Sequence, residues 1–135
     1  MRHLAAQEAP GLGLKIDSAG TADYHTGAAP DLRSQRAALR RGIDISDLRA
    51  RQVTRDDFAR FDFILAMDRE NLEALEAMRP KNSRARVALF LDYAPALNVP
   101  EVPDPYYGDT EDFERVLDLT TAASRGLLAR LQEGA

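Results

Sequence analysis

Cysteine is absent from all 135 residues of the chain. Its absence excludes disulfide bonds, zinc sites built from thiolates and any relay of thiols within the chain. Histidine is nearly absent, because His3 and His25 are the only two and are too scattered for a histidine-rich metal site. We therefore expect neither a metal nor a cofactor.

Long hydrophobic runs and a large charge excess are also missing. No apolar run approaches the roughly 20 residues that a membrane-spanning helix needs, and Met1-Arg2-His3-Leu4 lacks the layout of a signal peptide. The formal net charge of −4 and the pI of about 5.2 disfavour a general nucleic-acid binder. We expect a cytoplasmic protein with no membrane role and no nucleic-acid partner.

The composition is that of an ordinary folded domain, with 44% hydrophobic and 30% charged residues. A length of 135 residues predicts one domain over residues 1–135. Helices are expected over Met1–Glu8, Asp31–Arg41, a short stretch after Thr54, Asp68–Met78 and from Asp109 or Thr110 to Gly134. Strands are expected at a segment ending in Ser18–Thr21, at Phe61–Met67 and at Arg86–Leu91. This alternation predicts an α/β fold with a parallel sheet flanked by helices.

Local patterns add detail to these elements. Leu32, Ala38 and Leu39 are expected to form the buried stripe of the second helix. The nearly continuous apolar run Phe61–Met67 predicts a strand covered on both faces. The segment Thr54-Arg55-Asp56-Asp57 resembles a capping box, with Asp in the fourth position instead of the usual Glu.

An unusual loop, Asp104-Pro105-Tyr106-Tyr107-Gly108, follows the last expected strand. Ligands of open parallel sheets lie at the carboxyl ends of the strands, which is where this loop falls. A carboxylate beside aromatic rings in a cleft can have a raised pKa and donate a proton. A turn with surface tyrosines, in which Asp104 is only a local cap, is the plainer alternative.

Four segments occur in the order and approximate spacing of the low-molecular-weight protein tyrosine phosphatases. They are Ser18-Ala19-Gly20-Thr21, Arg49-Ala50-Arg51-Gln52-Val53-Thr54, Phe61-Asp62-Phe63-Ile64-Leu65-Ala66-Met67-Asp68 and Asp104-Pro105-Tyr106-Tyr107-Gly108. The chain resembles this family from its first residues to its last helix. The resemblance implies a single three-layer α/β domain of the phosphotyrosine phosphatase I-like kind, without its first strand.

The resemblance also implies an activity, the hydrolysis of phosphotyrosine proteins or aryl phosphates through a phosphocysteine intermediate. In this family a cysteine thiolate attacks phosphorus, and an aspartic acid protonates the departing phenol oxygen. By resemblance, Asp104 is the general acid, and Tyr106, Tyr107 and Tyr24 bind the ring of the substrate.

The family's nucleophile lies on a Cys-x5-Arg-Ser loop between its first strand and first helix, and this chain has no cysteine. We therefore expect an N-terminally truncated chain that is inactive as it stands. Ser18 and Thr21 have no histidine at a spacing that would suggest activation. Loss of an interior strand leaves unpaired backbone groups on both neighbours, so we also expect the chain to fold poorly on its own.

Two alternatives to a phosphatase stay open at this point. One is a non-catalytic, phosphatase-like binding protein that uses the tyrosines to hold a partner, although the retained Asp104 gives it little support. The other is an arsenate reductase that relies on an external thiol, because a relay within the chain would need cysteines. The sequence assigns neither an oligomeric state nor a particular physiological substrate.

Overall fold

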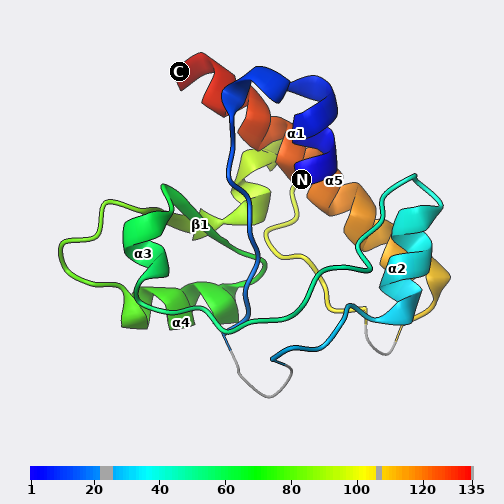
Figure 1. Cartoon of the computed structure of the whole chain (residues 1–135), viewed down its shortest axis with the longest axis horizontal. Coiled ribbons are helices and arrows are strands. Elements are labelled where there is room, and N and C mark those ends of the chain that lie inside the picture. Colours follow the sequence, from blue (N-terminus) through cyan, green and yellow to red (C-terminus); the bar gives the residue numbers. More distant parts are fainter. Residues whose placement is uncertain (22–25, 106–107, 135) are drawn as a thin grey trace.

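The computed structural model of the chain describes residues 1–21, 26–105 and 108–134. Helices and strands alternate along it and the strands are parallel, which confirms the α/β class (Figure 1). The α-helices are α1 (Arg2–Glu8), α2 (Leu32–Leu39), α3 (Asp57–Arg60), α4 (Arg69–Met78) and α5 (Thr110–Gly134). The strands are β1 (Phe63–Ala66) and β2 (Arg86–Leu89), and the 3-10 helices are η1 (Pro10–Leu12), η2 (Phe90–Tyr93) and η3 (Pro95–Leu97).

Within the described residues, the sheet consists of β1 and β2. The two strands pair in parallel, with Phe63 opposite Arg86 and Ala66 opposite Leu89. The strand expected to end at Ser18–Thr21 does not form: residues 13–19 cross the molecule as a stretched-out segment (Figure 1). A strand requires a neighbour for its backbone hydrogen bonds. Among the described residues, the bridge of this stretch is the one from Gly20, one residue beyond it, to Gln52.

Helices cover both faces of β1. Ile64 and Ala66 belong to an apolar cluster with residues of α3 and α4, whereas Phe63 and Leu65 pack against a cluster that contains residues of α5. Successive side chains of a strand point to opposite faces. The two clusters therefore explain why this strand is almost continuously apolar.

Aspartates define the starts of two helices at the expected positions. The Asp68 carboxylate accepts a hydrogen bond from the Asn71 N–H at 2.8 Å and caps α4. The Asp31 carboxylate accepts one from the Arg33 N–H at 2.8 Å and caps α2. Each cap satisfies a backbone donor that the first helical turn leaves unpaired.

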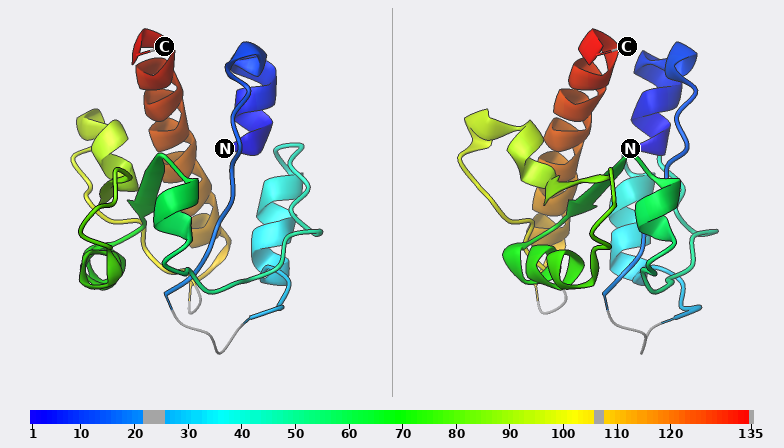
Figure 2. Two further views of the ribbon diagram at one scale, coloured as in Figure 1. Left: turned by 60° about the vertical axis from the view of Figure 1, so that its left-hand side comes forward. Right: turned by 90° about the vertical axis from the view of Figure 1, so that its left-hand side faces the viewer.

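The buried side of α2 differs from the expected one. Ala38 is buried as expected, but Leu32 and Leu39 are 64% and 58% exposed, and Ala37 is buried in their place. The helix packs against α5 (Figure 2), and its small alanine side chains allow a close approach. The expectation that the leucines are buried was therefore wrong.

The helix α5 is 25 residues long, and α1 and α2 both contact it (Figure 2). Arg41, just after α2, connects α2 to α5, because its guanidinium binds Glu114 at 2.6 Å and Asp118 at 2.9 Å. Neither α5 nor any other helix in the described ranges is long and apolar enough to cross a membrane.

Candidate active site

The loop that carries Asp104 starts at the carboxyl end of β1. The Val102 N–H donates to the Met67 carbonyl at 2.8 Å, and the Arg69 N–H donates to the Glu101 carboxylate at 2.8 Å. Val102 is also buried. Asp104 follows two residues later, so the structure brings it to the edge of the sheet where ligands of parallel sheets bind.

The other end of the loop is fixed at the start of α5. The Gly108 N–H donates to the Pro105 carbonyl at 2.8 Å. The Asp109 N–H donates to the Asp112 carboxylate at 3.1 Å, and the Asp112 N–H donates to the Asp109 carboxylate at 3.2 Å. This reciprocal pair is a capping box. A Cβ on residue 108 would overlap the Asp112 side chain, so a larger residue there would displace one half of the capping box.

Asp104 itself is exposed and lies between two prolines, Pro103 and Pro105. The proline rings restrict the backbone on both sides of it, so Asp104 lies on a stiff segment. Tyr24, Tyr106 and Tyr107 lie outside the described residues, and their roles in substrate binding stay predictions.

A third segment reaches the same edge. The Asn71 side chain, in the first turn of α4, donates to the Thr21 hydroxyl at 3.4 Å. This contact joins the end of residues 17–21 to the helix that follows β1. Residues 17–21, the carboxyl end of β1 and the start of the Asp104 loop therefore meet in space.

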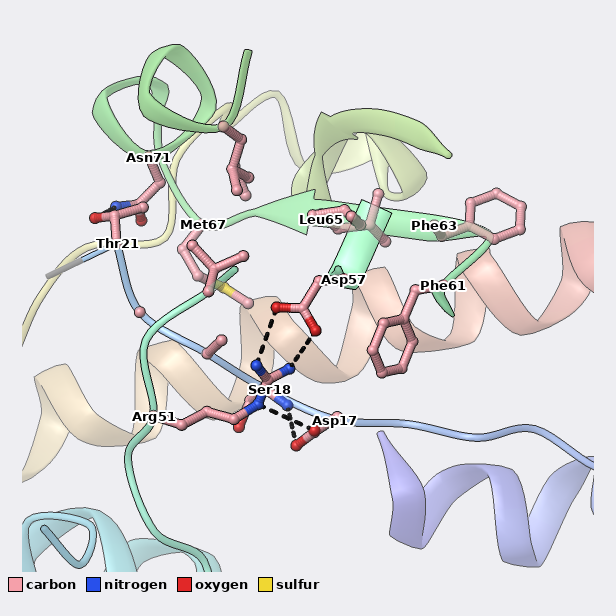
Figure 3. A pocket seen from close by; sticks show the side chains of 16 residues that line it. Asp17, Ser18, Thr21, Arg51, Asp57, Phe61, Phe63, Leu65, Met67 and Asn71 are labelled. Carbon is pink, nitrogen blue, oxygen red and sulfur yellow. Dashed lines mark hydrogen bonds and ion pairs between the residues drawn. The ribbon is translucent and has the colours of Figure 1, made fainter. Parts of the chain in front are cut away.

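A groove of about 190 Å³ separates residues 17–21 from β1 (Figure 3). One wall is the backbone of residues 17–21, and the opposite wall is β1. Phe61, Val53 and Leu75 contribute apolar side chains to it.

An ion pair between the buried Asp57 and the partly exposed Arg51 lies on this groove, and sequence reasoning missed it. Asp57 is 3% exposed, and its carboxylate accepts hydrogen bonds from Arg51 at 3.0 and 3.1 Å and from the Thr54 N–H at 2.9 Å. Burial alone would raise the pKa of Asp57, but these hydrogen bonds outweigh it and lower the pKa below its ordinary value. The Asp57 carboxyl is therefore ionised at neutral pH.

Arg51 extends this network to the opposite wall. Its Nε donates to the Asp17 carboxylate at 3.1 Å, while its two terminal nitrogens hold Asp57 (Figure 3). The hydrogen bonds to Asp57 are the largest cause that raises the pKa of Arg51, so its charge is permanent. The Thr54–Asp57 capping-box pattern was the only signal in the sequence for a specific role of Asp57.

Comparison with known proteins shows which family this chain resembles in sequence and in fold. The sequence profile described as "Low molecular weight phosphotyrosine protein phosphatase" matches residues 1–135. This chain belongs to that family. Its relative slr0328 of Synechocystis is 44% identical over 124 residues, which cover 90% of this chain and 78% of the relative. The low molecular weight protein-tyrosine-phosphatase YfkJ of Bacillus subtilis is 37% identical over 98% of this chain and 83% of its own length.

Solved structures of the phosphatase family have the same fold. The protein tyrosine phosphatase of Entamoeba histolytica, crystallised with Hepes in its active site, superposes with a TM-score of 0.92 at 33% identity. The match covers 98% of this chain and 85% of that one. The relatives carry phosphatase names, which does not favour the arsenate reductase alternative.

Proposed function

We propose that this chain forms the general-acid part of a protein tyrosine phosphatase that hydrolyses phosphotyrosine proteins or aryl phosphates. The observation that carries this proposal is the position of Asp104 at the carboxyl edge of β1, on a loop fixed at both ends, in a member of this phosphatase family. The cytoplasmic location expected from the sequence stays a prediction.

The proposed role of Asp104 is proton transfer in both halves of the reaction. When the bond between phosphorus and the phenolic oxygen breaks, the electron pair goes to that oxygen and Asp104 supplies its proton. The resulting carboxylate then accepts a proton from the water that attacks the phosphocysteine, and this releases inorganic phosphate and the thiolate. Tyr24, Tyr106 and Tyr107 would pack against the aromatic ring.

The nucleophile has to come from outside these 135 residues, because the chain has no cysteine. Ser18 and Thr21 lie at the groove, but the Thr21 hydroxyl already binds Asn71, and neither residue has a histidine at an activating spacing. We propose that the chain alone does not turn over phosphate esters and that activity requires a thiolate on an added segment.

A fusion protein tests whether this chain supplies the general acid while an added segment supplies the nucleophile. The N-terminal segment of YfkJ, up to the point where its match to this chain begins, is joined to Met1, and turnover of phenyl phosphate and p-nitrophenyl phosphate is measured. Asp104→Asn in the fusion should lower kcat for phenyl phosphate about 10²–10⁴-fold. The loss should be smaller for p-nitrophenyl phosphate, because its leaving group needs less protonation. Asp92→Asn, another exposed aspartate, is the matched control and should leave both rates unchanged.

Two results would contradict the proposal. One is equal loss for both substrates in the Asp104 variant, because a merely structural defect does not depend on the leaving group. The other is turnover by the unfused chain, which would show that no added thiolate is needed.

A further inference from the structure

Three arginines of α2 gather beside the start of α5, where the two helices pack together (Figure 1). Arg33, Arg36 and Arg40 are spaced by three and four residues, so they share one face of α2. With residues at the start of α5 they line a pocket of about 230 Å³, which we call the arginine pocket; its lining is Arg33, Arg36, Arg40, Asp109, Thr110 and Phe113. Because the chain has a net charge of −4, overall composition does not account for three cations around one pocket.

Two of these guanidinium groups are fixed by neighbours within the protein. Arg33 binds the Asp31 carboxylate at 2.9 Å and lies over the Phe113 ring, with its guanidinium carbon 4.8 Å from the ring centroid. Arg40 binds the Glu114 carboxylate at 3.1 Å. A guanidinium held by a carboxylate or an aromatic face keeps its charge and loses mobility. Arg33 and Arg40 therefore form two fixed positive sides of the arginine pocket.

Arg36 differs from the other two arginines because its donors are not used within the described protein. It is exposed, and in the part of the chain that the structure describes it makes no hydrogen bond or ion pair. Its planar set of N–H donors can therefore bind a ligand at the cost of displacing water only. The start of the 25-residue helix α5 adds a partial positive charge to the same pocket.

The chemistry of the arginine pocket favours a carboxylate as its ligand. Guanidinium groups bind the oxygens of carboxylates and phosphates in a bidentate manner. Asp109 lines the same pocket, and its carboxylate is kept there by the hydrogen bond that it accepts from the Asp112 N–H at 3.2 Å. A dianionic phosphate is repelled by this carboxylate about twice as strongly as a monoanionic carboxylate at the same distance.

The arginine pocket lies close to Asp104. The hydrogen bond from the Gly108 N–H to the Pro105 carbonyl closes a turn, and the Cα atoms at the two ends of such a turn lie within about 7 Å of each other. Asp104 and Asp109 each lie one residue, or about 3.8 Å, outside this turn. The two Cα atoms are therefore within about 15 Å, a distance that an extended peptide covers in four or five residues.

We infer that the arginine pocket is a specificity site, in which Arg36 binds the carboxylate of a Glu or Asp side chain of the polypeptide substrate within about five residues of its phosphotyrosine. This inference rests on the proposed function, because it takes Asp104 as the group beside which the phosphotyrosine lies. The contact forms in the substrate complex and persists in the transition state, so it lowers KM and leaves kcat unchanged.

A peptide series with the YfkJ fusion tests this specificity. Each phosphotyrosine peptide has one glutamate within five positions of the phosphotyrosine, and the reference peptide has glutamine at all of these positions. We expect kcat/KM to rise about three- to tenfold for glutamate at one position or at adjacent positions on one side, through KM. Arg36→Gln should abolish this preference. Arg36→Glu should transfer it to a peptide with lysine at the same position.

Arg130→Gln is the matched control. It removes the same charge from an exposed position of α5, 20 residues or about 30 Å along the helix from Thr110, and should leave the preference unchanged.

Three results would overturn the specificity site. They are equal kcat/KM for all peptides, a preference for glutamate at every position on both sides, and an equal loss of preference in the Arg36→Gln and Arg130→Gln variants, since the last two mean general attraction by charge. A phosphoserine preferred over glutamate at the same position would overturn the choice of a carboxylate. A fusion that hydrolyses no phosphate ester would refute the proposed function. The dissociation constants of the same peptides would then decide the arginine pocket separately, and equal values for wild type and Arg36→Gln would overturn it.

Discussion

Replacing Asp57 with asparagine removes one charge from the groove and keeps the shape of the side chain. The wild-type carboxylate accepts three hydrogen bonds, two from Arg51 and one from the Thr54 N–H. An asparagine has one acceptor oxygen, and its amide group would face the donors of the guanidinium. The substitution therefore breaks at least one charge-assisted bond in a nearly buried environment.

The expected loss in the free energy of unfolding depends on the contacts that Arg51 keeps in the variant. A hydrogen bond to a charged group contributes about 1.5–3 kcal/mol. Arg51 keeps its bond to Asp17 and its side chain is 33% exposed, so water compensates part of the loss. We expect Asp57→Asn to lower the free energy of unfolding by about 2 kcal/mol at pH 7.

The pH dependence of this stability difference shows whether the charge of Asp57 causes it. Folding lowers the pKa of Asp57 below its ordinary value of 3.8. Its stabilising contribution is therefore complete above that value and disappears as the pH falls through the lower pKa of the folded state. The difference between wild type and variant should stay constant from pH 7 to about pH 5 and close in stronger acid.

Urea unfolding followed by circular dichroism measures this difference in the fusion with the YfkJ segment. Asp56→Asn is the control, because Asp56 is exposed and its side chain makes no capping hydrogen bond. A loss below about 0.5 kcal/mol, which is typical of surface substitutions, would refute the reasoning. So would a difference that persists unchanged at pH 2.

Two further substitutions test the packing of α5. Gly126→Ala should destabilise the fold by about 2–3 kcal/mol in the same urea assay, because a Cβ there would overlap the Tyr93 carbonyl. Gly11→Ala has open space around its Cβ and should cost little, so equal losses for the two would contradict this packing. Arg41→Ala, which cuts the partly exposed ion pairs to Glu114 and Asp118, should cost less than about 1 kcal/mol and lose its effect at high salt. A larger loss that salt does not reduce would mean that Arg41 acts through packing.

Helix starts and the burial of a strand depend on residues that are close together in the chain, so they could be predicted from the sequence. Asp68 and Asp31 mark helix starts because a short carboxylate can reach the free N–H groups of the first turn. The apolar run of β1 identified a strand covered on both faces, because burial on two faces leaves few polar positions. The rule that ligands of parallel sheets lie at the carboxyl ends of the strands then placed the Asp104 loop at that edge, where the structure has it.

Features that depend on distant partners could not be predicted in this way. Ala37 is buried instead of Leu32 because the side of α2 that faces α5 is set by the close approach of two helices, and local hydrophobicity does not report that. Apolar patterning likewise gives no signal for a buried charge such as Asp57, whose partner Arg51 lies six residues away.

The Asp104 loop has two anchors in different parts of the fold. The carbonyl of Met67, one residue beyond β1, accepts the hydrogen bond of the Val102 N–H at the start of the loop. The other anchor is the capping box of Asp109 and Asp112 at the start of α5. Asp109→Ala should therefore loosen the second anchor and leave the first one unaffected. Amide exchange separates these anchors, because the Asp112 N–H should exchange faster in the variant while that of Val102 should not change.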